Sequence, residues 1–429
     1  MPDVVKISRA DTFYASVHPQ PARAALNGRV EVETAIVGGG LAGLCTALEL
    51  ARAGQSVAVI EAEVVGFGAS GRNGGIVSPA FACGSEAIED RVGKAAAMAL
   101  HRLSIEGAER VRASIRDLGI VGADPVPGLL NLRRYDRSDD LIAWRDAFAR
   151  DYGYEMTYLD RAAITERLAT RRYLHGVADP QAFHINPLAY LTGIASEIES
   201  LGGKVFETSP VLSHDLATVK RLRTPGGEVQ ARHVVFAMGG YTTALVPALQ
   251  RALLPIATYM IQTEASDALP QAIRTRAAVL DDRRASDYYR LVDGGRKLLW
   301  GGRISTMDAS PDGVAKSLRA AMQAVFPQLD HVKIERAWSG WMGYARHLMP
   351  QIGRLGPGAW YVTAFGGHGL NTTAVAGKVL AEAITGETDR IQMFAPWGLD
   401  WAGGRFGLVA AQATYWGLQA QDRWRERGL

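Results

Sequence analysis

The chain has 429 residues, of which 48% are hydrophobic and 21% are charged, and its formal net charge is +3. This length predicts two domains rather than one core, and so small a net charge, with Arg and Lys scattered along the chain, does not indicate nucleic acid or an anionic membrane as a partner. Two cysteines, Cys45 and Cys83, and nine dispersed histidines argue against a disulfide framework and against a metal site.

The N-terminal segment has no apolar stretch of the signal-peptide type, and the chain has no run of eighteen apolar residues. We therefore predict a cytoplasmic protein with no transmembrane segment. Residues 1–31 are polar and contain Pro19, Pro21 and Gly28, which predicts an irregular lead-in to the first domain.

A βαβ unit follows this lead-in. The segment "TAIV" is a short apolar run that ends in glycines, "LAGLCTALELARAG" has helical spacing, and "SVAVIE" is a second apolar run. A strand, a glycine-rich turn, a helix and a second strand within about thirty residues predict two parallel strands joined by a right-handed crossover.

Further elements follow in the middle of the chain. The pattern predicts a long helical stretch over 87–118, a strand over 128–135, partly helical residues at 138–172, and a helix over 186–203 that Asn186 can cap. The runs "KVFETSPV" and "HVVFAMGGYT" predict two more strands of the first sheet, whose carboxyl ends should face the crevice at the first glycine turn.

The second half of the chain changes character. Residues 252–306 alternate as in an antiparallel sheet, with a hairpin at 292–297, and a helix follows in "GVAKSLRAAMQAVFP". Residues 358–387 again predict a strand, a glycine-rich turn and a helix, and the last segment, with four tryptophans, predicts a terminal amphipathic helix. We predict a discontinuous nucleotide-binding domain (1–88, 180–245 and 340–395), a substrate domain (89–179 and 246–339) and a C-terminal helical tail (396–429).

Gly38, Gly40 and Gly43 form a G-x-G-x-x-G sequence at the predicted strand–helix turn. The first glycine permits the turn, the second lets a pyrophosphate approach the backbone, and the third lets the helix pack on the strand. Glu61 ends the second strand, where an acidic side chain accepts hydrogen bonds from a ribose. This combination predicts a dinucleotide site; the alternative is a glycine-rich contact between helix and strand with a surface glutamate.

Two more glycine-rich loops bear on which dinucleotide is bound. The loop "GFGASGRNGG" (66–75) follows Glu61 closely, and Ser70, the backbone N–H groups and the glycines could contact a pyrophosphate and a flat ring. The loop "FGGHGLNTT" (365–373) opens a helix, whose N-terminal N–H groups would stabilise the negative charge of a reduced flavin. Together they favour FAD over NAD; the alternatives are an ordinary flexible loop and, for His368, a packed turn histidine.

In order and spacing, four sets of segments carry a family resemblance: "IVGGGLAG…VIEA…GFGASGRNGG", "VVFAMGGYT", "YYRLVDGGRKLLWGGR" and "WSGWMGYARHLMPQIG…YVTAFGGHGLNTTAVAGKVLAEAITG". They resemble the FAD-dependent D-amino-acid oxidase superfamily, with its glycine-oxidase-like members, and are most similar to its gamma-glutamylputrescine oxidase type. The resemblance implies an α/β fold, with a glutathione-reductase-type FAD-binding Rossmann domain and an inserted substrate domain that has a mixed or antiparallel sheet. It also implies oxidation of a C–N bond to an imine, which hydrolyses to a carbonyl compound plus an amine or ammonia.

The resemblance also implies which residues contact the cofactor. It places the ADP half of FAD against Gly38, Gly40, Leu41, Ala42, Gly43, Glu61 and Ala62, adenine against the backbone of Val211, and Gly239 on the same side. It places the pyrophosphate and ring along Gly68, Ala69, Ser70, Arg72, Asn73, Gly74, Gly75 and Ile76, and the flavin ring at Gly366, Gly367, His368, Gly369, Leu370, Asn371 and Thr372.

Three positions depart from the relatives. Gly340 stands where sarcosine-oxidase relatives attach flavin through a cysteine, so we expect non-covalent FAD. Asn371 stands where those relatives carry a lysine that pairs with a substrate carboxylate. Arg290 falls one residue before the arginine of glycine-oxidase-like members, and a shift of one residue turns a strand side chain to the other face. An amine or a larger conjugate is therefore better supported as substrate than a simple α-amino acid.

Our mechanistic hypothesis is hydride transfer to flavin N5 from the carbon that bears a neutral amine, with O2 as acceptor and H2O2 as product. The hypothesis assigns no catalytic residue or general base. Tyr288, Arg290 and Trp300 on the antiparallel strands, with His184 and Asn371, are candidates for the substrate pocket. The alternative for these side chains is sheet packing.

Three other functions stay open at this point. An amino-acid dehydrogenase would pass its electrons to a quinone or a carrier. A monooxygenase fed by NAD(P)H would need a nicotinamide site, and we find no second unit of strand, complete G-x-G-x-x-G and helix. A flavin-binding subunit without oxidase turnover would use Trp397, Trp401, Trp416 and Trp424 as a partner surface, whereas the simpler interpretation packs the tail on its own domain.

Overall fold

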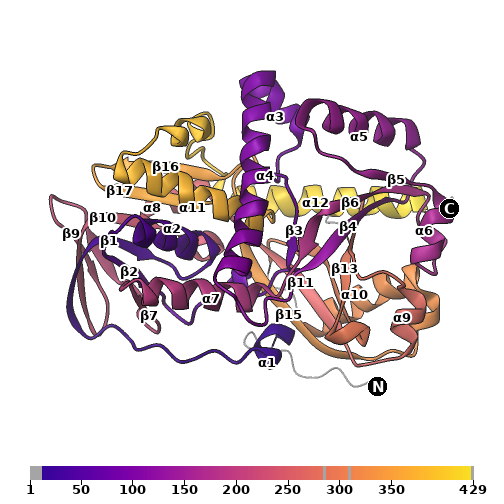
Figure 1. Ribbon diagram of the computed structural model, residues 1–429, viewed down its shortest axis with the longest axis horizontal. Helices are drawn as coiled ribbons and strands as arrows, with labels where there is room; N and C mark the ends of the chain where they lie inside the picture. Colours follow the sequence, from indigo (N-terminus) through magenta and orange to yellow (C-terminus); the bar gives the residue numbers. More distant parts are fainter. Residues whose placement is uncertain (1–11, 284–286, 308–310, 427–429) are drawn as a thin grey trace.

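Two β-sheets lie side by side in the molecule, with helices packed on them (Figure 1). The computed structural model describes residues 12–283, 287–307 and 311–426. The first sheet occupies the left half of Figure 1 and the second sheet the right half, and the long helix α4 (Lys94–Asp117) stands between them. In these described ranges no helix has the length and apolar character to cross a bilayer.

The first sheet is largely parallel. In the described part of the chain it has eight strands. Six follow the order β16–β17–β10–β1–β2–β7; of the other two, β9 pairs with β10 and β8 pairs with β9. Their bounds are β1 Gly28–Val37, β2 Val57–Ile60, β7 Lys204–Phe206, β8 Ser213–Asp215, β9 Lys220–Arg223, β10 Gly227–Phe236, β16 Gln351–Gly356 and β17 Ala359–Thr363. Because β17, β10, β1, β2 and β7 run parallel, their carboxyl ends lie at one edge, as predicted.

Helices cover one face of this sheet and a smaller layer covers the other. On the first face α2 (Leu41–Arg52), α7 (Pro187–Ser200) and α11 (Gly369–Thr385) share one hydrophobic core with α4. On the second face the strands pack against Leu222 and Leu249, the latter from α8 (Pro247–Ala252). Burial on both faces explains the continuous apolar runs of β1 and β2.

The second sheet is mostly antiparallel. Among the described residues it has nine strands, in the order β15–β11–β14–β13–β12–β4–β6–β3, with β5 beside β6 and with β12 parallel to β4. Their bounds are β3 Ile76–Val77, β4 Val126–Arg133, β5 Thr157–Leu159, β6 His175–His184, β11 Leu254–Thr263, β12 Ala278–Asp281, β13 Tyr288–Val292, β14 Lys297–Ser305 and β15 Ile334–Tyr344. Side chains of α10 (Pro311–Val325) complete its core.

The other helices and the 3-10 turns complete the fold. The remaining helices are α1 Phe13–Val17, α3 Ser85–Val92, α5 Ser138–Tyr152, α6 Arg161–Arg167, α9 Ala268–Ala272 and α12 Gly404–Glu426. The 3-10 turns are η1 Ala69–Gly71, η2 Gly239–Tyr241, η3 Asp293–Gly295, η4 Pro327–Leu329 and η5 Arg390–Phe394.

The predicted elements are largely confirmed, with three differences. The lead-in is not irregular throughout, because Thr12 caps the short helix α1 and β1 already begins at Gly28, where it pairs with β10. The predicted helix at 87–118 is two helices, since Gly93 has a φ of +79°. The strand predicted in "KVFETSPV" ends at Phe206, where pairing with β2 stops.

Sheet membership bears on the predicted domain boundaries, which stay a prediction. The boundary between 179 and 180 passes through β6, and β3 and the end of β15 pair in the second sheet although we assigned them to the nucleotide-binding domain. The terminal helix begins only at Gly404. Trp397 precedes it and is buried, and Trp401 precedes it and is exposed.

Candidate cofactor and active site

The first glycine turn joins β1 to α2 and leaves no room for side chains. Gly38 has a φ of +112°, and a Cβ there would lie 2.7 Å from the Ala237 carbonyl oxygen. A Cβ at Gly43 would lie 2.0 Å from the Gly38 carbonyl oxygen, and a Cβ at Gly40 would lie 2.9 Å from Ser70 Oγ. Each of the three glycines is therefore required by close backbone packing or by the second loop.

Glu61 follows β2 and reaches back to this turn. Its Oε2 accepts a hydrogen bond from Gly39 N at 2.6 Å, and its Oε1 accepts one from Glu63 N at 2.9 Å. Burial raises the pKa of the Glu61 carboxyl, and the two N–H donors act against that rise. The carboxyl group is thus held at the glycine turn and is not a free surface group.

The second loop, residues 66–75, folds against the first turn. Ser70 Oγ accepts a hydrogen bond from Leu41 N at 3.0 Å, which ties η1 to the first residue of α2. The Asn73 side chain braces the loop from inside: Nδ2 donates to the carbonyl oxygens of Ala69 and Ser70, and Oδ1 accepts from Gly75 N at 2.8 Å. Three hydrogen bonds between one side-chain amide and the backbone favour a rigid, ordered loop over an ordinary flexible connection.

Arg72 links this loop to the second sheet. It is 6% exposed; its Nε donates to the Phe67 carbonyl oxygen at 2.6 Å and its Nη1 donates to the Ser339 carbonyl oxygen at 3.3 Å. The Arg72 carbonyl oxygen accepts a hydrogen bond from Trp338 Nε1 at 2.8 Å. Residues of β15 therefore hold the second loop in place through both the side chain and the backbone of Arg72.

We expect Arg72→Ala to weaken FAD retention or flavin reduction while the fold survives. The change leaves two carbonyl oxygens without their donor, which typically costs about 1–3 kcal/mol per buried group, but it empties neither core. The ratio of flavin absorbance to protein after gel filtration measures retention, and circular dichroism checks the fold. Arg91→Ala is the control, because Arg91 also donates to a backbone carbonyl oxygen, that of Pro396, but is exposed and lies outside the loop. Normal flavin content and turnover in Arg72→Ala would contradict a cofactor role for the loop.

The third glycine turn joins β17 to α11 and meets two other segments. Gly366 N donates to the Gly343 carbonyl oxygen at 3.1 Å, and a Cβ at Gly343 would lie 3.2 Å from the Gly239 carbonyl carbon. Gly366 and Gly367 have φ values of +57° and +89°. The end of β15 and the turns after β10 and β17 therefore converge on one place.

His368 is the N-cap residue of α11. Its Nδ1 is buried and has no hydrogen-bond partner among the described residues. Burial lowers the pKa of the ring, so His368 is neutral near neutral pH. A buried ring nitrogen without a partner, at the start of a helix, favours contact with a bound polar group over simple packing in a turn.

Tyr288 lies on the face of β13 that looks toward the second loop. Its ring fits between Gly74 and Gly301, where a Cβ would come within 2.8 Å and 2.1 Å of it. Its hydroxyl is 3.3 Å from Thr258 Oγ1, and burial raises the pKa of Tyr288 to about 12. The phenol therefore stays protonated beside the loop.

Arg290 lies on the same face, two residues further along β13. Its Nε donates to the Gly74 carbonyl oxygen at 2.7 Å, and its Nη2 donates to the Ile185 carbonyl oxygen at 2.7 Å and to the Tyr14 hydroxyl at 3.1 Å. Its Nη1 donates to His184 Nδ1 at 2.9 Å. The guanidinium is 5% exposed and uses these donors on neutral groups, so Arg290 holds Gly74 of the second loop in position.

His184 is the last residue of β6 and stays neutral. Because its Nδ1 accepts from Arg290, its Nε2 carries the hydrogen and donates to the Arg276 carbonyl oxygen at 2.9 Å. Burial, with the charge of Arg290, lowers the pKa of His184 to about 3. The ring therefore orients Arg290 and has both nitrogens occupied.

The structure does not bring the other two pocket candidates to this face. Trp300 is the register partner of Tyr289, and their rings stack at 4.4 Å in the core on the opposite face from Tyr288. Asn371 is 2% exposed, and its Nδ2 donates to the carbonyl oxygens of Ala80 at 3.1 Å and Ser104 at 3.4 Å. Trp300 is therefore a core residue of the second sheet, and Asn371 joins α11 to α4.

Sequence reasoning missed two tyrosines. Tyr14 of α1 is fully buried and donates to the Asn73 carbonyl oxygen at 2.7 Å. Tyr344 ends β15, and its hydroxyl would lie 3.1 Å from a Cβ at Gly367. Burial raises the pKa of both phenols. No local motif marks Tyr14, whereas Tyr344 closes the segment "WSGWMGY", which is the signal that points to it.

The remaining predicted cofactor residues surround the same turns. Ala62 follows Glu61, Gly68 and Ala69 open η1, Val211 lies between β7 and β8, Gly239 opens η2, Ile76 lies in β3, Leu41 and Ala42 open α2, and Gly369, Leu370 and Thr372 open α11. The glycine cradle, the acid at its edge and the unpartnered His368 Nδ1 fit an extended dinucleotide such as FAD.

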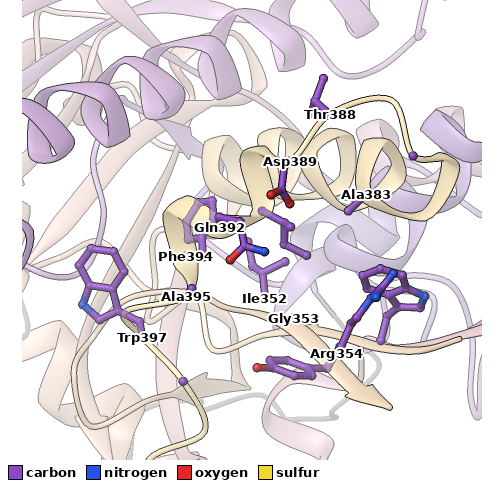
Figure 2. A pocket seen from close by; sticks show the side chains of 15 residues that line it. Ile352, Gly353, Arg354, Ala383, Thr388, Asp389, Gln392, Phe394, Ala395 and Trp397 are labelled. Carbon is purple, nitrogen blue, oxygen red and sulfur yellow. The ribbon is translucent and has the colours of Figure 1, made fainter. Parts of the chain in front are cut away.

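A separate cavity of about 440 Å³ lies beside β16, α11 and η5. Figure 2 shows Arg354, Asp389, Gln392 and Trp397 around it. None of the predicted cofactor or substrate residues lines this cavity, so it does not belong to the site built by the glycine turns.

Comparison with known sequences gives consistent matches over most of the chain. Residues 33–383 match the protein family described as DAO, FAD dependent oxidoreductase. Over 374 residues the chain is 34% identical to gamma-glutamylputrescine oxidoreductase of Escherichia coli (strain K12), covering 86% of this chain and 87% of that protein. It is 25% identical over 385 residues to a glycine oxidase of Bacillus licheniformis, covering 85% of this chain and 97% of that protein.

Solved structures share the fold. A glycine oxidase from Geobacillus kaustophilus has a TM-score of 0.73 at 22% identity, covering 86% of this chain and 99% of that chain. An L-amino acid deaminase from Proteus vulgaris, lacking its specific insertion sequence, has a TM-score of 0.73 at 18% identity, covering 91% and 99%. These likenesses confirm the predicted fold class, and together with the match over residues 33–383 they establish that the chain belongs to the family of FAD-dependent oxidoreductases.

Proposed function

We propose that this enzyme oxidises the C–N bond of an amine, a polyamine conjugate or an amino acid and that O2 reoxidises it, with H2O2 as product. The observation that supports this most directly is the convergence of three glycine-rich turns beside Tyr288 and Tyr344, in a chain similar to an enzyme named for gamma-glutamylputrescine. When bound, FAD supplies the hydride-accepting ring. The protein's own residues bind it, exclude water and position the substrate carbon.

The substrate-binding side of the site offers no free cation in the two places where relatives use one. Arg290 has its donors on Gly74, Ile185, Tyr14 and His184, and the residue at the lysine position is Asn371, whose amide is also engaged. The carboxylate of a simple α-amino acid would therefore find neither a free arginine nor a lysine at these two positions. This supports an amine or a larger conjugate as substrate, with the protonated phenols of Tyr288 and Tyr344 available as polar contacts.

We propose that the flavin is bound without a covalent link. Gly340 replaces the cysteine of sarcosine-oxidase relatives, and a Cβ there would lie 3.1 Å from Ala69 Cα. Cys45 is buried in α2, where burial raises the pKa of its thiol to about 12, so it is an inert thiol. Acid precipitation should therefore release all flavin into the supernatant; yellow colour that stays with the protein pellet would contradict this proposal.

Anaerobic mixing of the holoenzyme with a substrate panel tests the reaction. The panel should contain amines, polyamine conjugates, N-methyl amines, and D- and L-amino acids. We expect the visible flavin band to bleach with an amine or conjugate, and the same mixture in air should give one peroxide per amine consumed. Bleaching without peroxide in air would assign the electrons to a carrier instead of O2. No bleaching with any C–N donor would contradict the proposed reaction.

A further inference from the structure

The terminal helix α12 exposes a continuous apolar stripe. Phe406, Val409, Trp416 and Trp424 are 85%, 69%, 55% and 73% exposed. With the exposed alanines Ala413 and Ala420, these positions recur at intervals of three or four residues and therefore lie on one side of the helix. A helix on the surface of a globular protein normally turns such a stripe toward the core.

The side of α12 that faces the protein mixes half-buried Leu408, Ala411 and Leu418 with side chains that make polar contacts. Gln412 Oε1 accepts hydrogen bonds from Thr306 N at 2.9 Å and Ser305 Oγ at 3.2 Å, and the Tyr415 hydroxyl accepts one from Ile304 N at 3.1 Å. Gln412 and Tyr415 are both buried against the end of β14. In Figure 1 this helix, in yellow, extends across the right half of the molecule, which holds the second sheet. The polar bonds fix the rotation of α12, so the apolar stripe is turned outward.

Among the described side chains of α12, the charges that are exposed all have one sign: Arg405 near the beginning and Arg423 and Arg425 near the end. Arg405 and Arg423 border the apolar stripe, whereas Arg425 lies over the Tyr135 ring on the other side of the helix. The net charge of +3 for the whole chain conceals this local distribution. A stripe of aromatic and aliphatic side chains bordered by arginines matches the requirements of a helix that lies in the interface of an anionic bilayer.

A second copy of the chain fits the stripe less well. If two α12 helices paired along their stripes in a parallel arrangement, Arg405 would meet Arg405, and in an antiparallel arrangement Arg405 would approach Arg423. Either pairing brings like charges together, which opposes association. The indole rings of Trp416 and Trp424, each with an apolar body and one N–H donor, suit the boundary between headgroups and acyl chains.

We propose that α12 is an in-plane docking helix that seats this enzyme on an anionic lipid surface. Phe406, Val409, Trp416 and Trp424 enter the acyl boundary, and Arg405 and Arg423 meet the phosphate headgroups. This proposal concerns where the enzyme sits, and it stands independently of the amine oxidation proposed above.

Flotation of the full-length holoenzyme with lipid vesicles tests the proposal. We expect the enzyme to float with vesicles of phosphatidylcholine containing phosphatidylglycerol, and to float far less with pure phosphatidylcholine. A variant with Trp416→Ser and Trp424→Ser should lose binding, and Arg405→Gln with Arg423→Gln should weaken it about thirtyfold. Raised salt should weaken the wild type in the same direction.

Matched controls separate docking from general stickiness and from damage to the enzyme. Val121→Ser removes an apolar side chain that is 86% exposed elsewhere, and it should leave flotation unchanged. Flavin content and melting temperature should be unchanged in every α12 variant. Failure of the wild type to float with anionic vesicles would overturn the proposal. A dimer in gel filtration that the two tryptophan changes dissociate, without vesicle binding, would assign the stripe to a second copy instead.

Discussion

A Gly43→Ala variant is expected to lose FAD and to unfold at a clearly lower temperature. The added Cβ would lie 2.0 Å from the Gly38 carbonyl oxygen and 3.2 Å from Ile36 Cγ2, so α2 must move away from the end of β1. Overpacking of this kind typically costs about 1–3 kcal/mol and more where backbone must move. The same movement displaces the N-terminal N–H groups of α2 that a pyrophosphate would contact.

Flavin absorbance per protein after gel filtration and the thermal unfolding midpoint, with and without added FAD, measure the two effects. Gly356→Ala is the matched control, because a Cβ at Gly356 has no atom within 4 Å and the residue needs no positive φ. We expect the control to keep both its flavin and its midpoint. A Gly43→Ala protein with full flavin content would show that the contact between α2 and β1 does not govern cofactor binding.

The second large effect is expected for Arg290→Met. Methionine keeps much of the apolar stem but leaves the carbonyl oxygens of Gly74 and Ile185 without their donor. Each unsatisfied buried acceptor costs about 1–3 kcal/mol, so the total loss of stability should be on the order of 2–5 kcal/mol. Because the Gly74 carbonyl belongs to the second loop, we also expect weaker flavin retention.

This prediction separates a positioning role for Arg290 from a substrate-binding role. If Arg290 bound a substrate carboxylate, its replacement would raise KM and leave flavin content and melting temperature nearly unchanged. If Arg290 holds the loop, its replacement lowers flavin content and melting temperature, and KM changes less than kcat. Arg296→Met, in the hairpin at the far end of the same strand, is the control, since Arg296 is exposed. A pure KM effect in Arg290→Met would contradict the role that we assign to Arg290.

The cofactor side of the site follows from local sequence. Gly38, Gly40 and Gly43 lie between a strand and a helix, and Glu61 lies at the end of the next strand, so spacing alone brings them together through one βαβ crossover. The second and third loops lie at the carboxyl ends of parallel strands or directly after them, which places them at the same edge of the sheet. Short-range geometry therefore makes these parts predictable.

The substrate side depends on contacts between residues far apart in the chain. Tyr14 reaches Asn73 and Arg290, and no motif in the short segment around Tyr14 indicates either contact. Alternation along the antiparallel strands predicted that Tyr288 and Trp300 lie in a sheet. The face that each side chain occupies follows from the cross-strand register, in which Trp300 opposes Tyr289.

The terminal helix shows the same division. The last segment, with its four tryptophans, predicted a terminal amphipathic helix, because amphipathicity is a local property of the sequence. Which side faces the protein was decided by the hydrogen bonds of Gln412 and Tyr415 to the end of β14, more than a hundred residues earlier in the chain. An amphipathic pattern shows only that the two faces of the helix differ. Packing against a distant strand selects which face meets solvent. The free energy that favours one orientation comes from these long-range contacts, which the local sequence does not contain.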